Sequence, residues 1–74
     1  METRNIPKDL VILDVEPVEI TNPFSGQSTT LEPDAVAVYD WIMGSQVLEN
    51  YTDMRKGLNW FRKHEPEAYM ILLD

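Results

Sequence analysis

The spacing of apolar residues predicts strands in the first part of the chain and helices in the second. Residues 10–20, LVILDVEPVEI, are rich in β-branched side chains and are predicted to form a strand. Because Pro17 has no backbone N–H to donate, this strand must lie at a sheet edge or contain a bulge. Residues 28–31 are predicted to form a second, shorter strand. The pattern therefore indicates an antiparallel hairpin.

The segment between the two predicted strands has the composition of a tight turn. Pro23 restricts the backbone, Gly26 can take a positive φ, and the Asn22 side chain can bond the backbone two residues on. A phosphate-binding loop needs several glycines leading into a helix, usually with a lysine, and here there is one glycine and no lysine. We expect a structural turn, with Phe24 folded onto the core as a hydrophobic lid.

Helical spacing begins at Pro33, a residue that suits the first turn because the N–H it lacks would have no partner there. Trp41 and Ala37 lie opposite the main apolar face, so a helix over residues 33–50 should be central to the core. Gly44 is expected to end or loosen it. The main apolar face consists of Ala35, Val38, Tyr39, Ile42 and Met43.

A second helix is predicted over residues 51–64, capped by Asn50 or Thr52 and ended by the Glu65-Pro66 pair. Its predicted buried stripe consists of Tyr51, Met54, Leu58 and Phe61. We expect Leu58 and Phe61 to contact Tyr39 and Ile42 of the first helix. The final run over residues 69–73 is apolar on every side, so it is either buried in the core or paired with another chain, as in a homodimer.

These elements predict an α+β fold. An N-terminal hairpin of two or three short strands packs on two main helices and a short third helix. The 74 residues allow a single domain, with residues 1–8 as a loose N-terminal arm. The chain has no cysteine, which excludes disulfides and thiolate metal sites. It shows neither a signal sequence nor a membrane-spanning run, so a soluble cytoplasmic protein is expected.

Charge is unevenly distributed along the chain, whose net charge is −7. Residues 51–64 hold four bases and one acid, whereas the other sixty residues hold twelve acids and two bases. The overall acidity argues against ordinary duplex-DNA binding, which depends on phosphate neutralisation. The basic segment leaves a local nucleic-acid site open. The acidic remainder leaves open a basic protein partner or mimicry of nucleic acid.

No candidate residues form a catalytic or cofactor signature. His64 has no nucleophile at a useful spacing, so a structural role at the helix end is favoured over catalysis. Asp14, Glu16 and Glu19 lie on the first predicted strand, where a solvated face is favoured over a cation site because no calcium-loop pattern surrounds them. We expect no enzyme, no cofactor and no metal.

The two tryptophans lie off the main helical stripes. Buried core is the commoner environment for each, but tryptophan beside basic residues is also typical of interfaces, and Trp60 is the better surface candidate. One hypothesis is therefore a contact patch of Lys56, Trp60 and Lys63. The alternative is that these bases only neutralise the acidic strands of the same domain. If the patch fails, the acidic face around Asp14, Glu16 and Glu19 is the next candidate.

The blocks ITNPFSGQ, LEPDAVAVYDWIMG and YTDMRKGLNWFRKHEPEAYMILLD together resemble small proteins of tailed bacteriophages. The shared features are an Asn-Pro-Phe turn, a helix opened by Leu-x-Pro and a closing Tyr-Met-x-Leu-Leu-Asp, within residues 18–74. Glu32 departs from the family pattern, in which Thr or Ser caps the helix. The resemblance implies a phage-encoded protein acting in the host cytoplasm. By analogy of class, small acidic phage proteins bind and redirect host proteins.

The leading functional hypothesis is a non-enzymatic accessory protein that binds a host or phage protein and inhibits or redirects host machinery. The alternative is a small nucleic-acid-binding or regulatory module that uses the basic helix over residues 51–64. An enzyme is the third hypothesis.

Overall fold

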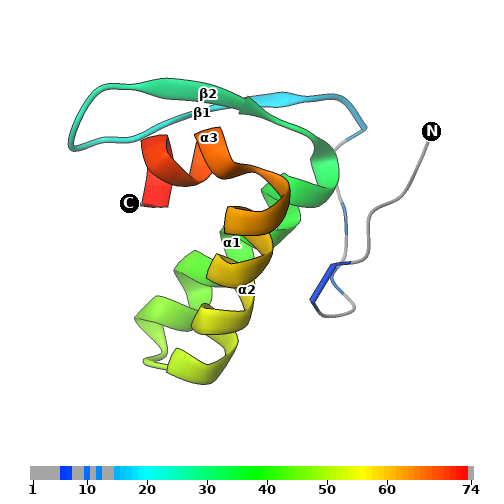
Figure 1. Ribbon diagram of the computed structural model, residues 1–74, viewed down its shortest axis with the longest axis vertical. Helices are drawn as coiled ribbons and strands as arrows, with labels where there is room; N and C mark the ends of the chain where they lie inside the picture. The colour runs from blue at the N-terminus through cyan, green and yellow to red at the C-terminus, as the bar shows by residue number, and fades with distance from the viewer. Residues whose placement is uncertain (1–5, 8–9, 11, 13–14, 74) are drawn as a thin grey trace.

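The structure, a computed structural model, describes residues 6–7, 10, 12 and 15–73. In this part of the chain a hairpin and a short C-terminal helical segment lie over one end of two long helices (Figure 1). The predicted α+β class is confirmed. The elements are β1 (Val18–Thr21), β2 (Ser28–Leu31), α1 (Pro33–Val47), α2 (Tyr51–His64), α3 (Pro66–Ala68) and the π-helical turn η1 (Tyr69–Leu73). No helix among these residues is long and apolar enough to span a membrane.

The hairpin is shorter than the sequence predicts. β1 pairs antiparallel with β2 over all four residues of each strand. Of the strand predicted over residues 10–20, positions 18–20 belong to β1, whereas residues 10, 12 and 15–17 are not in a strand. β2 has no further residues that could pair with the positions before Val18, because Pro33 begins α1 two positions after Leu31. Predicted strand positions 11, 13 and 14 lie outside the described residues.

The turn between the strands forms as its composition predicts. Asn22 Oδ1 accepts a hydrogen bond from the backbone N–H of Phe24 at 2.8 Å, and Gly26 takes a φ of +78°. Backbone bonds from Asn22 N to the Gln27 carbonyl and from Gly26 N to the Asn22 carbonyl, both 2.8 Å, close the loop. The turn is therefore held by its own backbone and one short side chain.

The prediction that Phe24 forms a lid over the core is wrong, because its side chain is 97% exposed. The residue that ties the turn to the rest of the fold is Asn22, whose Nδ2 donates to the Ile71 carbonyl at 2.9 Å. With Asn22 turned towards the C-terminal segment, the next residues of the turn project outward. Phe24 is left in solvent at the tip of the hairpin.

α1 begins at Pro33 as predicted, and Glu32 before it makes no side-chain capping bond. Gly44 does not end the helix, which runs on to Val47. The helix ends instead with Glu49 in the left-handed region, at a φ of +57°. The N–H groups of Glu49 and Asn50 bond the carbonyls of Gln46 at 3.1 Å and Ser45 at 2.8 Å, the two bonds of a Schellman cap.

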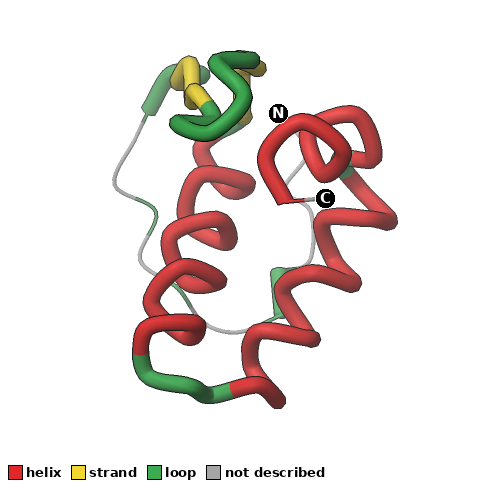
Figure 2. Tube along the Cα trace, turned by 90° about the vertical axis from the view of Figure 1, so that its left-hand side faces the viewer, coloured by secondary structure: helices red, strands yellow, loops and turns green. Residues whose placement is uncertain are grey.

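α2 packs side by side with α1 along its length, and the two are joined by a three-residue connection (Figure 2). Asn50 is the predicted cap, with Oδ1 accepting from the Asp53 N–H at 3.2 Å. Phe61 lies at the centre of the core, and its ring centroid is 6.3 Å from that of Tyr39. The buried apolar residues are Leu31, Ala35, Val36, Val38, Ile42, Trp60, Phe61, Ala68 and Leu72.

Tyr51 was predicted in the buried stripe of α2 but is 59% exposed. It is the first residue of the helix, at the end of the helix pair that the hairpin and C-terminal segment do not cover (Figure 1). Val47 and Leu48 are exposed at the same end. Helical spacing predicts which face is apolar, but burial also needs a third element above that face.

Both ends of the described chain return to the core. Ile6, from the expected N-terminal arm over residues 1–8, packs against the core, while most of that arm lies outside the described residues. At the other end Leu72 is buried and η1 packs against β2 and α2, although Met70 faces solvent. The apolar C-terminal run is therefore buried along one side only.

Candidate functional site

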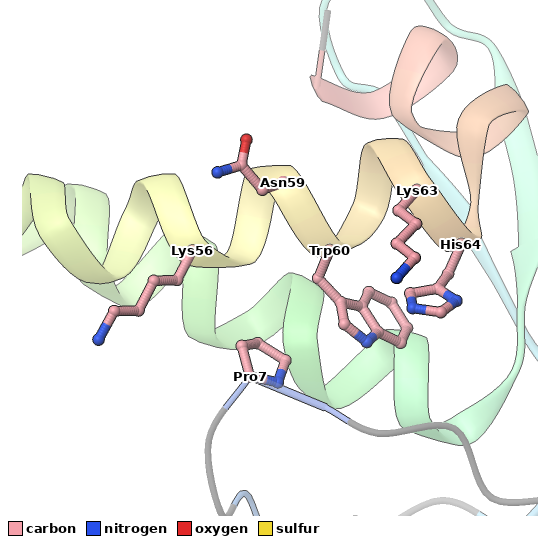
Figure 3. A pocket seen from close by; sticks show the side chains of 6 residues that line it. All are labelled: Pro7, Lys56, Asn59, Trp60, Lys63 and His64. Carbon is pink, nitrogen blue, oxygen red and sulfur yellow. The ribbon is translucent and has the colours of Figure 1, made fainter.

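The basic face of α2 borders an open pocket of about 480 Å³ (Figure 3). Positions 56, 59, 60 and 63 are spaced at three or four residues, so one side of the helix presents them together. Lys56 and Lys63 are two turns apart, about 10 Å along the axis. The lining residues are Pro7, Lys56, Asn59, Trp60, Lys63 and His64. The three residues of the predicted contact patch thus lie around one hollow.

Trp60 lines this pocket but is not an exposed side chain. It is only 7% exposed, so of the two predicted environments the core is right and the surface placement is wrong. Its ring packs edge-on against Phe61, with centroids 5.6 Å apart. On the outer side Pro7 lies next to it (Figure 3). Pro7 is 53 positions away in sequence, so helical spacing alone could not reveal this cover.

His64 fits the structural role expected for it. Its imidazole lies against the Trp60 indole, with centroids 4.9 Å apart and an interplanar angle of 41°. It is half-buried in the last turn of α2, where basic residues are favoured by the helix dipole. Its neighbours in that turn are Arg62 and Lys63. No serine, threonine or cysteine is among the described residues that line the pocket beside His64.

Lys56 and Lys63 are exposed and make no ion pair or hydrogen bond in the described part of the chain. Arg62 differs, because its Nη2 donates to the Tyr69 hydroxyl at 3.3 Å and its guanidinium lies 5.3 Å from that ring's centroid. Arg62 therefore holds η1 against α2. Within the described part of the chain the two lysines make no such contact.

The predicted acidic face is only partly within the described residues. Glu19 is exposed on β1, Glu16 is exposed in the bend before it, and Asp14 lies outside the described residues. Among the residues that the structure describes, no group of three or more His, Asp or Glu could hold a metal ion. The solvated interpretation suits Glu16 and Glu19.

The described lining of the pocket combines two ammonium groups, one amide and one imidazole with an apolar floor. No carboxylate is among these described residues. Such a set of groups suits a ligand that carries carboxylates or other acidic groups beside an apolar part, because the rim supplies charge and the floor supplies contact area. The described lining residues include no hydroxyl or thiol nucleophile beside a base and no pair of carboxylates for acid–base chemistry.

A second hollow of about 340 Å³ lies beside the β1–β2 turn, and the sequence did not predict it. It brings together this turn, positions 39–46 of α1 and the C-terminal turn. The lining residues are Asn22, Pro23, Phe24, Tyr39, Met43, Gln46, Leu72 and Leu73. None of them is charged. The signal available in the sequence was an aromatic residue in a polar turn, which was interpreted as a lid.

No protein-family model, curated protein or solved structure matches the chain. The resemblance to small phage proteins therefore stays a prediction.

Proposed function

We propose that this is a non-enzymatic accessory protein that binds another protein through the Lys56–Lys63 face of α2. The observation that carries the proposal is a pair of exposed lysines around a pocket floored by Trp60, on a chain of net charge −7; neither lysine makes an ion pair within the described residues. In a strongly acidic protein, bases without an internal partner on one face favour an external one. The resemblance to phage proteins supports a role in the host cytoplasm, inhibiting or redirecting host machinery.

The partner that suits this face is an acidic segment of a protein with at least one apolar side chain. Two carboxylates about 10 Å apart can reach Lys56 and Lys63, as residues two turns apart on a helix would. An apolar side chain between them can enter the pocket and contact the edge of Trp60. The lysines then steer approach, and the apolar contact slows release.

Nucleic acid is the weaker candidate for the same face. Binding to single strands relies on exposed aromatic faces on which bases stack, and Trp60 offers little of its ring to solvent. The sixty residues outside positions 51–64 carry a net charge of −10, which repels a phosphate backbone. A protein segment with few, well-placed acids meets less of this repulsion.

The test is capture from a bacterial lysate on three columns: the parent, Lys56→Glu/Lys63→Glu, and Arg55→Glu as a control. Arg55 is also exposed on α2 but does not line the pocket. The proposal expects a protein that the parent and the Arg55 variant retain and the double variant does not. Equal retention by all three columns contradicts the assigned face. Salt-sensitive binding of a single-stranded oligonucleotide, lost in the double variant, would replace a protein partner with nucleic acid.

A further inference from the structure

Phe24 projects from the surface beside a hollow, and the described residues that line this hollow are uncharged. The side chain is 97% exposed, yet it sits at the lip of a hollow lined by Tyr39, Met43, Leu72 and Leu73. A large apolar side chain this exposed at a defined position is unusual for a folded monomer.

The position of Phe24 is maintained by hydrogen bonds on both sides of the turn. Its own N–H donates to Asn22 Oδ1 at 2.8 Å, and Asn22 Nδ2 donates to the Ile71 carbonyl at 2.9 Å. The second bond ties the turn to the segment that supplies Leu72 and Leu73 to the hollow. The projecting ring and the cavity are thus held at a set separation, which keeps the ordering cost of binding low.

We propose that this surface binds a second copy of the same chain, with Phe24 of each protomer in the hollow of the other. An isologous dimer uses one patch twice, so it needs a projection and a cavity on the same surface, which this patch supplies. The hollow, about 340 Å³, is large enough for the ring, since about 150 Å³ suffices to hold benzene.

Shape favours a second copy at this patch, because the same surface carries both the projecting ring and a hollow that can receive it. Two chains of net charge −7 repel each other, so contact between them is least opposed where the contacting residues are uncharged. None of the described residues that line the hollow is charged. Two such patches exclude water together when they meet. A single aromatic anchor per protomer predicts a weak dimer that forms as concentration rises.

Sedimentation equilibrium of the full chain, from micromolar to millimolar concentration, tests this proposal. The parent should dimerise, and Phe24→Ser should weaken the dimer by at least about tenfold. Tyr51→Ser is the matched control, because Tyr51 is also an exposed aromatic side chain and does not line the hollow. It should dimerise like the parent. A parent that stays monomeric throughout, or a Phe24→Ser variant that dimerises equally well, overturns the proposal.

A second measurement locates the ring. In a mixed sample of labelled and unlabelled chains, filtered NOEs should connect Phe24 of one protomer to Leu72 or Leu73 of its partner. NOEs found only within one chain would mean that the ring closes on its own hollow, which also overturns the proposal. The Lys56→Glu/Lys63→Glu variant should dimerise like the parent, so failure here is distinguishable from failure of the proposed partner site.

Discussion

Replacing Gly57 by alanine tests how closely the two main helices approach. Gly57 is buried on the side of α2 that faces α1. A Cβ there would overlap Ile42 Cγ1, and it would lie 3.0 Å from Ile42 Cδ1 and 3.6 Å from Trp41 Cε3. Ile42 is 1% exposed, so its side chain has no free space to move into. The helices must therefore shift apart or the isoleucine must leave its rotamer.

Two opposing effects decide the sign of the stability change. Alanine is favoured over glycine in a helix by about 1 kcal/mol. Overpacking a filled core costs about 1–3 kcal/mol. Because the clash involves Cγ1, near the base of a buried side chain, we expect the upper part of that range and a net destabilisation of about 1–2 kcal/mol. In a domain of this size each 1 kcal/mol lowers the melting temperature by about 4–8 °C.

Gly44→Ala is the matched control. Gly44 lies in α1, is exposed, and a Cβ there would meet nothing within 4 Å. Only the helix-propensity term remains, so this variant should be more stable by about 1 kcal/mol. Urea unfolding followed by circular dichroism measures both variants. If Gly57→Ala stabilises the protein as much as Gly44→Ala does, the close contact of α1 and α2 at Ile42 is refuted.

Three further predictions concern the end of α1, the core and the tip of the hairpin. Glu49→Gly should stabilise the fold by about 1 kcal/mol in urea unfolding, because Glu49 takes a φ of +57° that glycine adopts without strain; no gain would argue against this cap. Phe61→Ala should cost about 3–5 kcal/mol, enough to unfold a small domain, because Phe61 is fully buried. Phe24→Ala should leave the melting temperature of the monomer unchanged, because the side chain is exposed. A clear drop would instead support the prediction that Phe24 packs on the core.

The features that the sequence predicted correctly depend on neighbouring residues. Pro33 starting α1, Asn50 capping α2 and the turn bond of Asn22 each involve positions no more than three apart. The errors arise from contacts between distant segments. Whether Phe24 faces the core depends on the bond from Asn22 to Ile71, 49 residues away. β1 begins only at Val18, because β2 is four residues long and Val18 pairs with its last residue, Leu31. Residues 10–17 alone do not show where β2 ends.

The same contrast between local spacing and contacts of distant segments applies to the candidate site. Lys56, Trp60 and Lys63 share a side of α2 by helical period alone, so the sequence could bring them together. The burial of Trp60 beside Pro7 depends on the path of the N-terminal segment, which helical spacing does not predict. The hollow beside Phe24 forms where three segments of the chain meet, and no local sequence pattern predicts that meeting.

The central claim is that the Lys56–Lys63 face binds an acidic protein segment. Trp60→Ala is a poor test, because a side chain only 7% exposed also supports the fold. The most direct measurement is the association rate of the captured partner with the parent and with Lys56→Glu/Lys63→Glu across a salt series. We predict that the variant associates at least about tenfold more slowly at low salt, with a flatter salt dependence, and that the difference shrinks as salt screens the charges. Equal rates and equal salt dependence would contradict the claim and direct attention to the acidic face around Glu16 and Glu19.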